Sequence, residues 1–195
     1  MAGTLYITGD PEADGLLNED GTALLIGMLL DQQVPMEWAF AGPRTLRDRL
    51  GHLDAERIAS MSEEDFLAVC AGKPAIHRFH GAMGKRIHAL CGVIADEYGG
   101  DGANVWAGVA DGAELARRLR ALPGFGEEKA RIFVALLAKS QGIAPPGWEE
   151  AAGPFGDATP RSVADITGPE SLAEVRAWKK AQKAAKLDKQ GRPTA

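Results

Sequence analysis

The sequence LPGFGEEKA at residues 122–130 places two glycines between two patterns of helical periodicity. Pro123 ends the first pattern, because a proline has no amide proton to donate within a continuing helix. Gly124 and Gly126 permit positive φ angles and put no side chain over the turn, and Phe125 supplies an apolar plug between them. The stretch therefore predicts a tight hairpin between two helices.

The helix after this hairpin is expected to hold its first amides rigidly at the surface. Residues 132–138 (IFVALLA) are apolar on nearly every face, which indicates a buried helix. Unpaired amides at the amino end of a helix bind anions such as a DNA phosphate, and a backbone contact of this kind reads no base sequence. A simple connection between two helices is the alternative interpretation of the same residues.

Helical periodicity accounts for nearly the whole chain. Asp20 offers a cap to an almost continuously apolar helix, and Ser62 and Asp111 each begin a capping box. Only residues 4–8 (TLYIT) alternate like a strand, and one short strand does not make a sheet. Helices are expected over residues 22–30, 37–50 with an interruption near Gly42-Pro43, 54–61, 62–71, 83–98 and 111–122, with later starts at Thr159-Pro160 and Ser171.

The composition is that of a globular protein that needs no disulfide or structural metal. The chain has 195 residues, of which 45% are hydrophobic and 25% are charged. Its longest apolar run, residues 23–30, is far shorter than the about twenty residues that a membrane-spanning helix needs. The amino-terminal residues lack the features of a secretory signal, which predicts a cytoplasmic location. Cys70 and Cys91 are too few for an iron–sulfur cluster or a zinc site, so reduced, buried thiols are expected.

The net charge of −5 argues against a nucleic-acid partner, but the charge is unevenly distributed. Residues 161–195 carry eight Lys and Arg against four acids, a net charge of +4, whereas residues 1–160 carry −9. No acid lies between Asp65 and Asp96, although several basic residues fall there. Both basic regions are suited to a polyanion. The alternative is a solvated tail and a chance gap in the acids.

Three motifs together resemble one family. LPGFGEEKA is similar to the helix-hairpin-helix motif of the HhH-GPD superfamily of DNA glycosylases. Upstream, LLDQQV at residues 29–34 resembles the end of the early buried helix in endonuclease III-like members, where a glutamine fills the gap left by an extruded base. Between them, HGAMGKRI at residues 80–87 resembles the segment that enters a helix whose basic end lies near the DNA backbone. The matches occur in the family's order over roughly residues 22–141.

The resemblance implies an all-α, two-lobed architecture, with one helical lobe over residues 22–141 and a second lobe built from residues 1–21 and 142–195. It implies a monomer that acts on double-stranded DNA in base excision repair, where it hydrolyses the N-glycosidic bond of a flipped, damaged or mismatched base. Gln33 is the expected wedge in the duplex, and Gln32 is its neighbour. The other expected DNA contacts are Lys85, Arg86, Pro123, Gly124, Phe125, Gly126 and Lys129.

The sequence departs from the family at the position of the lyase nucleophile. Bifunctional members carry a lysine two residues after the second hairpin glycine, and Glu128 stands there in this chain. Lys129 follows one residue later, about 100° around the helix, and is not expected to face the same site. Glu127 and Glu128 are expected to complement the helix dipole, and the activity is expected to lack lyase chemistry.

A second departure concerns the carboxylate that assists departure of the base. Family members place an aspartate roughly twenty residues past the hairpin, where it stabilises the cationic sugar and orients the attacking water. Residues 142–151 contain no aspartate. Glu150 is the preferred substitute, with Glu149 and Asp157 as the other candidates, although either glutamate is equally an ordinary first-turn acid of a short helix. Loss of the chemistry is the remaining alternative.

The resemblance implies a monovalent cation on the hairpin carbonyls and otherwise no cofactor. The iron–sulfur loop of several relatives is absent, and no metal site is expected, because His77, His80 and His88 lack a carboxylate or thiolate at useful spacing and are expected to face phosphate. The basic residues of the carboxyl-terminal segment are expected to neutralise phosphate, with fraying from about residue 186 onward. They are Arg176, Lys179, Lys180, Lys183, Lys186, Lys189 and Arg192.

Two other functions stay open. The missing aspartate favours a catalytically silent protein of the same fold that binds lesions or distorted duplex. The net negative charge favours a helical interaction domain unrelated to DNA, which predicts no salt-sensitive affinity for DNA.

Overall fold

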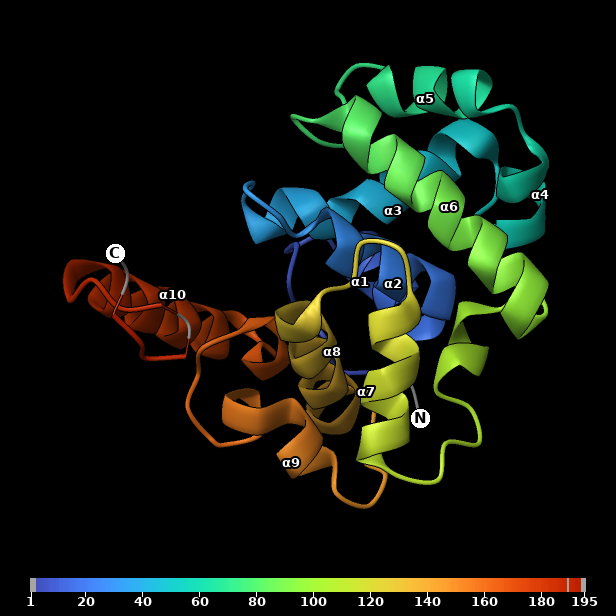
Figure 1. Cartoon of the computed structure of the whole chain (residues 1–195). Coiled ribbons are helices and arrows are strands. Elements are labelled where there is room, and N and C mark those ends of the chain that lie inside the picture. The colour runs from blue at the N-terminus through green and yellow to red at the C-terminus, as the bar shows by residue number, and fades with distance from the viewer. Residues whose placement is uncertain (1–2, 189, 194–195) are drawn as a thin grey trace.

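The computed structural model describes residues 3–188 and 190–193, and these are helical over most of their length (Figure 1). Within this described part no strand forms, so the expected all-α class is confirmed. The α-helices are α1 (Pro11–Glu19), α2 (Gly21–Leu30), α3 (Met36–Leu50), α4 (Ala55–Ser60), α5 (Glu63–Ala71), α6 (His80–Tyr98), α7 (Gly112–Ala121), α8 (Glu127–Ser140), α9 (Trp148–Ala152) and α10 (Pro169–Ala184). Short 3₁₀ helices lie at η1 (Gly102–Val105), η2 (Gly153–Phe155) and η3 (Val163–Asp165).

Helix α2 lies in the centre of the core. All its residues from Thr22 onward are buried, because an apolar side chain occupies almost every position. The Asp20 carboxylate accepts a hydrogen bond from the Ala23 amide (2.9 Å), so the predicted cap is confirmed. Helix α3 packs along α2, and a Cβ on Gly42 would lie only 2.4 Å from the Leu30 side chain. Glycine at this position therefore lets the two helices approach each other.

The same contact explains why the predicted interruption of α3 is wrong. The helix runs unbroken from Met36 to Leu50 with Pro43 inside it, and Gly42 serves the packing against α2 instead of a break. No helix begins at Thr159-Pro160 either. Asp157 Oδ1 accepts the Thr159 amide (2.8 Å) and holds a local turn there.

Residues 4–8 pair with a helix end and a loop and form no strand. The Thr4 amide donates to the Ser140 carbonyl (2.9 Å), and the Tyr6 amide donates to the Ile166 carbonyl (3.4 Å). The alternating pattern reflects the burial of Leu5 and Ile7. The amino-terminal segment thus contacts the carboxyl-terminal part of the chain, while the division into two lobes at residues 22 and 141 stays a prediction.

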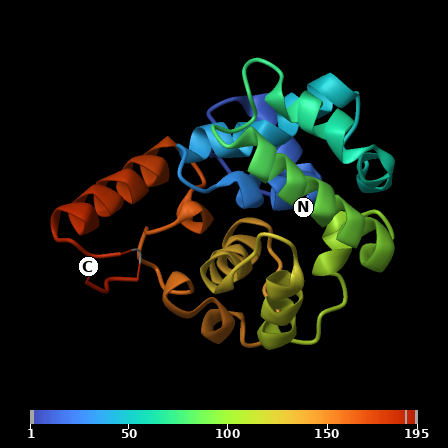
Figure 2. The same ribbon diagram turned by 45° about the horizontal axis from the view of Figure 1, so that its top comes forward.

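Helix α10 extends away from the other helices (Figure 2). It is anchored where Val175 is fully buried, and beyond it Asp188 Oδ1 accepts the Arg192 amide (2.9 Å). The described residues of this segment therefore hold a local turn, and the fraying from about residue 186 onward stays a prediction. Lys189, one of the predicted basic residues, lies outside the described residues. No described helix combines the length and the apolar character needed to cross a membrane.

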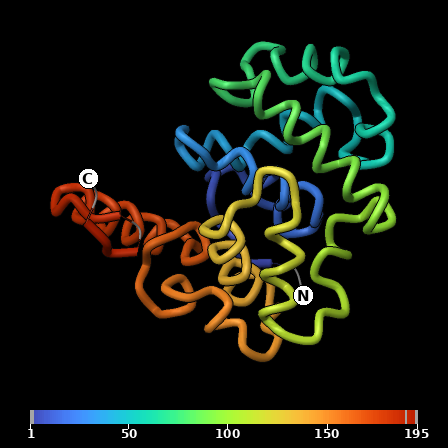
Figure 3. Tube along the Cα trace, in the orientation of Figure 1, coloured from blue at the N-terminus to red at the C-terminus, as the bar shows by residue number. Residues whose placement is uncertain are grey.

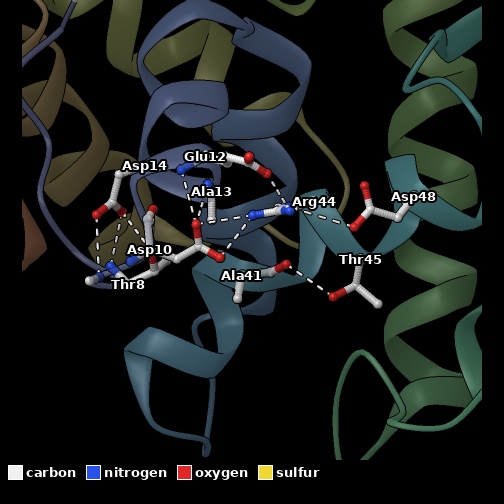
Figure 4. A network of polar contacts seen from close by, with 10 residues as sticks. Thr8, Asp10, Glu12, Ala13, Asp14, Ala41, Arg44, Thr45 and Asp48 are labelled. Carbon is white, nitrogen blue, oxygen red and sulfur yellow. Dashed lines mark hydrogen bonds and ion pairs between the residues drawn. The ribbon is translucent and has the colours of Figure 1, made fainter.

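Helices α7 and α8 are joined by a turn that lies over the carboxyl end of α2 (Figure 3). Elsewhere in the fold, carboxylates of the α1 region anchor the amino-terminal segment (Figure 4). Asp14 Oδ1 accepts the Ile7 amide (3.1 Å) and the Thr8 amide (2.9 Å), and Arg44 of α3 binds Asp10 at the cap of α1 (2.8 Å). These contacts join the amino-terminal segment and α1 to the α2–α3 pair.

Candidate functional site

The turn between α7 and α8 is the hairpin that the sequence predicts. The Leu122 carbonyl accepts the Phe125 amide (3.1 Å), and Gly124 adopts φ +82°, a left-handed conformation that favours glycine. Phe125 is only 5% exposed and sets its ring edge-on to Phe133, with 5.8 Å between the ring centroids. A Cβ on Gly126, the cap of α8, would meet nothing within 4 Å. The backbone at the start of α8 is therefore open to a ligand.

The hairpin lies against the two other segments that the motifs identified. A Cβ on Gly124 would lie 3.3 Å from the Leu29 side chain and 3.6 Å from Cδ of Arg86. Arg86 in turn donates from Nη1 to Oε1 of Gln32 (3.1 Å). The end of α2, the first half of α6 and the hairpin therefore meet at one place.

Residues 31–34 between α2 and α3, here termed the wedge turn, contain one residue with a strained backbone conformation. Asp31 has φ −70° and ψ 72°, and the Gln32 amide donates to the Leu30 carbonyl (2.7 Å), which is an inverse γ-turn. Gln33 follows with φ +59°, which costs a residue with a side chain on the order of 1 kcal/mol. Its side chain is exposed. Backbone strain at such a residue is typical of positions that contact a ligand.

Lys129 reaches under the wedge turn. Its Nζ donates to the carbonyl oxygens of Met28 (2.6 Å), Leu29 (2.8 Å) and Asp31 (3.2 Å). Oε2 of the adjacent Glu128 accepts from Nε2 of Gln190 (3.3 Å), so the two side chains bind different partners although both line one cleft. The expectation that Lys129 does not face the position of the lyase nucleophile stays a prediction. The cleft follows the first turn of α8 far enough to include both positions.

His77 holds the next carbonyl of the wedge turn. The ring is fully buried, its Nε2 lies 2.9 Å from the Gln32 carbonyl, and its Nδ1 accepts the Phe79 amide (3.0 Å). Because Nδ1 accepts this hydrogen bond, it carries no proton, and the proton of the neutral ring must lie on Nε2. Burial lowers the pKa of His77 below its ordinary value, which favours this neutral form. The expectation that His77 faces phosphate is wrong.

A cleft of about 960 Å³ opens beside the wedge turn and the hairpin. Met28, Met36 and Ile132 supply apolar lining, and Arg176 and Lys179 of α10 contribute positive charge. Six of the nine predicted DNA contacts line this cleft, namely Gln32, Gln33, Arg86, Gly124, Gly126 and Lys129.

The other three predicted contacts lie close to this lining. Phe125 is the buried plug of the hairpin, and Pro123 precedes Gly124 in the same turn. Lys85 is exposed on α6 next to Arg86, and its Nζ lies 3.0 Å from Oε1 of Glu63. The role of all nine residues in DNA binding stays a prediction.

Helix α10 reaches the cleft through two side chains. Arg176 forms an ion pair with Glu37 of α3, and Lys179 Nζ lies 4.0 Å from Sδ of Met36. The basic carboxyl-terminal helix thus borders the same cleft as the hairpin. This position is compatible with its predicted contact with phosphate.

The three predicted catalytic carboxylates do not line the cleft. Glu150 borders a smaller hollow of about 310 Å³ together with Arg120 and Arg131. Glu149 is exposed, and Asp157 forms an ion pair with Arg161 (2.5 Å). The carboxylates that do line the cleft are Asp31, Glu37 and Glu128.

Of these three cleft carboxylates, Glu37 is paired with Arg176, and Oε2 of Glu128 accepts a hydrogen bond from Nε2 of Gln190 (3.3 Å). Asp31 belongs to the wedge turn itself. Neither Asp31 nor Glu37 was predicted from the sequence as a catalytic carboxylate, although both lie within a few residues of Gln33.

Two exposed aromatic side chains beside the wedge turn were also missed. Trp38 is 39% exposed and Phe79 is 43% exposed, and the buried His77 ring lies between them, with centroid distances of 6.3 Å and 5.9 Å. The Arg78 guanidinium lies over the Phe79 ring at 4.7 Å. The closeness of Trp38 to the Gln33 motif was the available signal, but tryptophan is more often a core residue.

The cysteines and acidic groups give no sign of a metal centre in the described part of the chain. No group of three or more His, Cys, Asp or Glu side chains there is placed to hold a metal ion. Cys70 and Cys91 are free and buried, and burial raises the pKa of both thiols to about 12. Both therefore stay protonated and unreactive at neutral pH.

Comparison with protein families gives one match. A family model described as HhH-GPD superfamily base excision DNA repair protein matches residues 26–193. This range contains the wedge turn, the hairpin and α10. A search of curated proteins found no match.

Proposed function

The chain belongs to the HhH-GPD superfamily of base excision DNA repair proteins, and from this we propose that it is a DNA glycosylase. It hydrolyses the N-glycosidic bond of a damaged or mismatched base that is flipped out of duplex DNA, and it leaves an abasic site. The observation that carries the proposal is Gln33, an exposed side chain on a strained backbone at the edge of a cleft lined by hairpin glycines. A DNA substrate agrees with the predicted cytoplasmic location.

The proposed roles follow from the positions of the residues. The hairpin backbone, which lines the cleft at Gly124 and Gly126 and is open at Gly126, binds a phosphate through amides, and Arg86 and Lys85 add charge along the same backbone. Gln33 enters the duplex and fills the space of the flipped nucleotide, whose unstacking costs a few kcal/mol. The flipped base then enters the cleft. A single chain is sufficient for these contacts, and we propose a monomer.

We propose that the enzyme is monofunctional. Glu128 occupies the position that bifunctional relatives give to the lysine nucleophile, and a carboxylate does not form a Schiff base. A carboxylate assists departure of the base by stabilising the cationic sugar and orienting water. Asp31, Glu37 and Glu128 line the cleft and are the candidates for this role, whereas Glu149, Glu150 and Asp157 would require a rearrangement of the loop after α8.

We propose that carbonyls of the hairpin backbone bind a monovalent cation. The carbonyls of Leu122 and Gly126 accept amides from Phe125 (3.1 Å) and Ala130 (3.0 Å). A carbonyl oxygen has two lone pairs, so each of these oxygens retains one for a cation. A cation bound there would add positive charge beside the proposed phosphate site. No other cofactor is part of the proposal.

A catalytically silent protein that binds lesions or distorted duplex is the second candidate. The observation that favours it is the absence of the three predicted carboxylates from the cleft. Both candidates predict affinity for DNA that falls steeply with salt, which a helical interaction domain unrelated to DNA does not.

The test is base release from duplexes that each carry one lesion, with strand breaks measured with and without alkali. Suitable lesions are alkylated purines, hypoxanthine, uracil, oxidised guanine and mispaired adenine. We expect alkali-dependent breaks on at least one duplex, and we expect Gln33→Ala to reduce them. Breaks without alkali would contradict the monofunctional assignment. No release from any duplex, together with tight salt-dependent binding to abasic duplex, would support the silent binder.

A further inference from the structure

The carboxyl end of α2 is completed by a residue from a distant part of the chain. A helix leaves its last four carbonyls without helical amide partners. In α2 all four are satisfied, two by amides of the wedge turn and two by the ammonium of Lys129. The carbonyl and donor pairs are Gly27 with Asp31 (3.1 Å), Met28 with Lys129 (2.6 Å), Leu29 with Lys129 (2.8 Å) and Leu30 with Gln32 (2.7 Å).

The third contact of the same ammonium is with the wedge turn. Lys129 Nζ donates to the Asp31 carbonyl (3.2 Å), so one amine bridges the end of α2 and the first residue of the turn. A lysine ammonium has three protons, and three carbonyls surround this one. Positive charge is also favourable at the carboxyl end of a helix.

The next residue of the wedge turn, Gln32, is held by two other side chains. His77 Nε2 binds the Gln32 carbonyl (2.9 Å), and Arg86 Nη1 binds the Gln32 side chain (3.1 Å). Gln33 itself adopts φ +59°, a conformation that persists only where the surrounding structure enforces it. Lys129 therefore fixes Asp31. His77 and Arg86 fix Gln32, which lies between Asp31 and Gln33.

We propose that Lys129 is a positioning residue for base flipping, whose ammonium ties the wedge turn to the end of α2 and holds Gln33 in the conformation that enters the duplex. The inference rests on the proposed function, because it assigns a role to Lys129 within the same site. It also changes the expected role of Lys129 from a DNA contact to an internal support. An ammonium whose protons bind carbonyls has no lone pair for attack on a sugar, in agreement with the absence of lyase chemistry.

The physical advantage is preorganisation. A turn that is flexible in the free protein must lose its conformational freedom when it enters DNA, and this loss weakens binding and flipping. Without Lys129 the carbonyls of Met28, Leu29 and Asp31 lose their donor, and water or an altered turn must replace it. Misplacement of a reacting group by about 1 Å can cost on the order of a hundredfold in rate.

The first test uses the free wild-type protein and no DNA. Lysines are modified with an amine-reactive acetylating reagent, and the rate at each lysine is measured by mass spectrometry. We expect Lys129 to react at least about tenfold more slowly than Lys85, because its amine must leave three carbonyls before it can react. Lys85, with a side chain that is 60% exposed, is the matched control. Equal rates would overturn the inference.

The second test measures flipping directly. The duplex carries 2-aminopurine beside a stable abasic analogue, and insertion of a wedge raises the fluorescence of the unstacked 2-aminopurine. We expect Lys129→Met to reduce the rise at saturating protein about tenfold, while its affinity for undamaged duplex and the salt dependence stay as in the wild type. Lys129→Arg should not restore the rise, because a planar guanidinium cannot direct three protons at these carbonyls.

Lys85→Met serves as the contrasting variant. It removes a proposed phosphate contact, so it should reduce affinity and lower the salt slope by about one, while the fluorescence rise at saturating protein is retained. A full rise with Lys129→Met would overturn the inference. Recovery of affinity and fluorescence with Lys129→Arg would also overturn it and would identify Lys129 as a phosphate contact.

Failure of the proposed function gives a different result. If the wild type protects Lys129 but raises no fluorescence on any duplex, the wedge role and the proposed function are both overturned, and only the internal support remains. If Lys129→Met does not fold, as judged by its thermal unfolding, Lys129→Arg and the acetylation rates still decide the inference.

Discussion

Helix α8 separates two hollows that are lined by different sets of residues. The cleft on one side, of about 960 Å³, is lined by residues of the wedge turn, the hairpin glycines and two basic side chains of α10. The hollow on the other side, of about 310 Å³, contains Glu150 among Arg120, Glu127 and Arg131. Adjacent residues of α8 face different sides, since Glu127 borders the small hollow and Glu128 borders the cleft. A carboxylate near the hairpin in sequence can therefore lie far from the proposed chemistry.

The path of the chain after α8 explains the difference. The Gly112 amide at the start of α7 donates to the Pro146 carbonyl (2.8 Å), and a Cβ on Gly112 would lie 2.6 Å from the Gly147 carbonyl. This close contact brings α9 against α7. Glu150, in the first turn of α9, consequently borders the small hollow, and neither Glu149 nor Glu150 lines the cleft.

The largest expected effect comes from removing the carboxylates of one side. A triple variant with Asp31→Asn, Glu37→Gln and Glu128→Gln should release base at least about a hundredfold more slowly, because acid–base assistance typically contributes that much. The matched variant Glu149→Gln with Glu150→Gln should stay within about threefold of the wild type. Single-turnover base release measures both, and the three single variants then identify the residue.

Loss of activity in the Glu149 and Glu150 variant, with the triple variant unaffected, would reverse the comparison. It would show that the loop after α8 rearranges on DNA so that α9 reaches the cleft. Tight binding of both variants to abasic duplex, measured in parallel, separates a loss of chemistry from a loss of DNA binding.

The second effect concerns the hairpin between the two sides. Gly126→Ala should leave the thermal unfolding unchanged, because its backbone (φ −89°, ψ 179°) suits any residue and its Cβ meets no protein atom. The added methyl group lies at the proposed phosphate site, so DNA affinity should fall about tenfold. Titration of abasic duplex by fluorescence anisotropy measures this loss.

Gly124→Ala is the matched variant, and its expected effect is on the stability of the protein. A residue with a side chain at φ +82° is strained by about 1–2 kcal/mol, and the new Cβ would press on Leu29 at 3.3 Å. The unfolding temperature should fall. A stable Gly124→Ala protein, or a Gly126→Ala protein with full DNA affinity, would contradict the proposed division between turn geometry and phosphate binding.

The fold was predictable where local residues decide the structure. The hairpin depends on Pro123, Gly124, Phe125 and Gly126, which are adjacent, and the buried position of α2 depends on its own apolar run. Prediction failed at Gly42, where the reason for a glycine is the neighbouring helix and cannot be read from α3 alone.

The candidate site was predictable only as a set of motifs. Gln32, Arg86 and Gly124 were identified separately, and the structure brings them together. The strain at Gln33 depends on the support that Lys129 and His77 give to the preceding residues, and both are distant in sequence. The placement of Glu150 depends on the packing of α9 against α7, which no local pattern encodes.

A smaller effect is expected on the cleft side of α8 when the pH is lowered. The pKa of His77 in the folded protein is lowered by burial, so the unfolded chain binds a proton more readily. The stability that the neutral ring contributes is complete above the ordinary histidine pKa of about 6.5, and it is lost as the pH falls below that value toward the folded pKa. The unfolding temperature should therefore fall between pH 7 and pH 5.

Thermal unfolding across this pH range measures the effect, with His77→Gln and His80→Gln as the compared variants. The part of the pH dependence due to His77 should disappear in His77→Gln and persist in His80→Gln. Fluorescence of the 2-aminopurine duplex should weaken only at lower pH, as the lowered folded pKa is approached, because protonated Nδ1 can no longer accept the Phe79 amide that lies next to the wedge turn. An unchanged pH profile in His77→Gln would contradict this assignment.

The smallest effect is expected on the other side of α8, at Glu127. Hydrogen bonding to Arg120, with added charge from Arg131, lowers the pKa of this carboxyl in the folded protein. Its contribution to stability is therefore present at neutral pH and is lost as the pH falls through the lowered folded pKa. Because the pair is exposed, Glu127→Gln should lower the unfolding temperature only slightly at pH 7, and the difference from the wild type should vanish in acid. Base release and DNA affinity should stay unchanged, since Glu127 borders the small hollow and does not line the cleft. A loss of either would give that hollow a part in the reaction and would end the distinction between the two sides of α8.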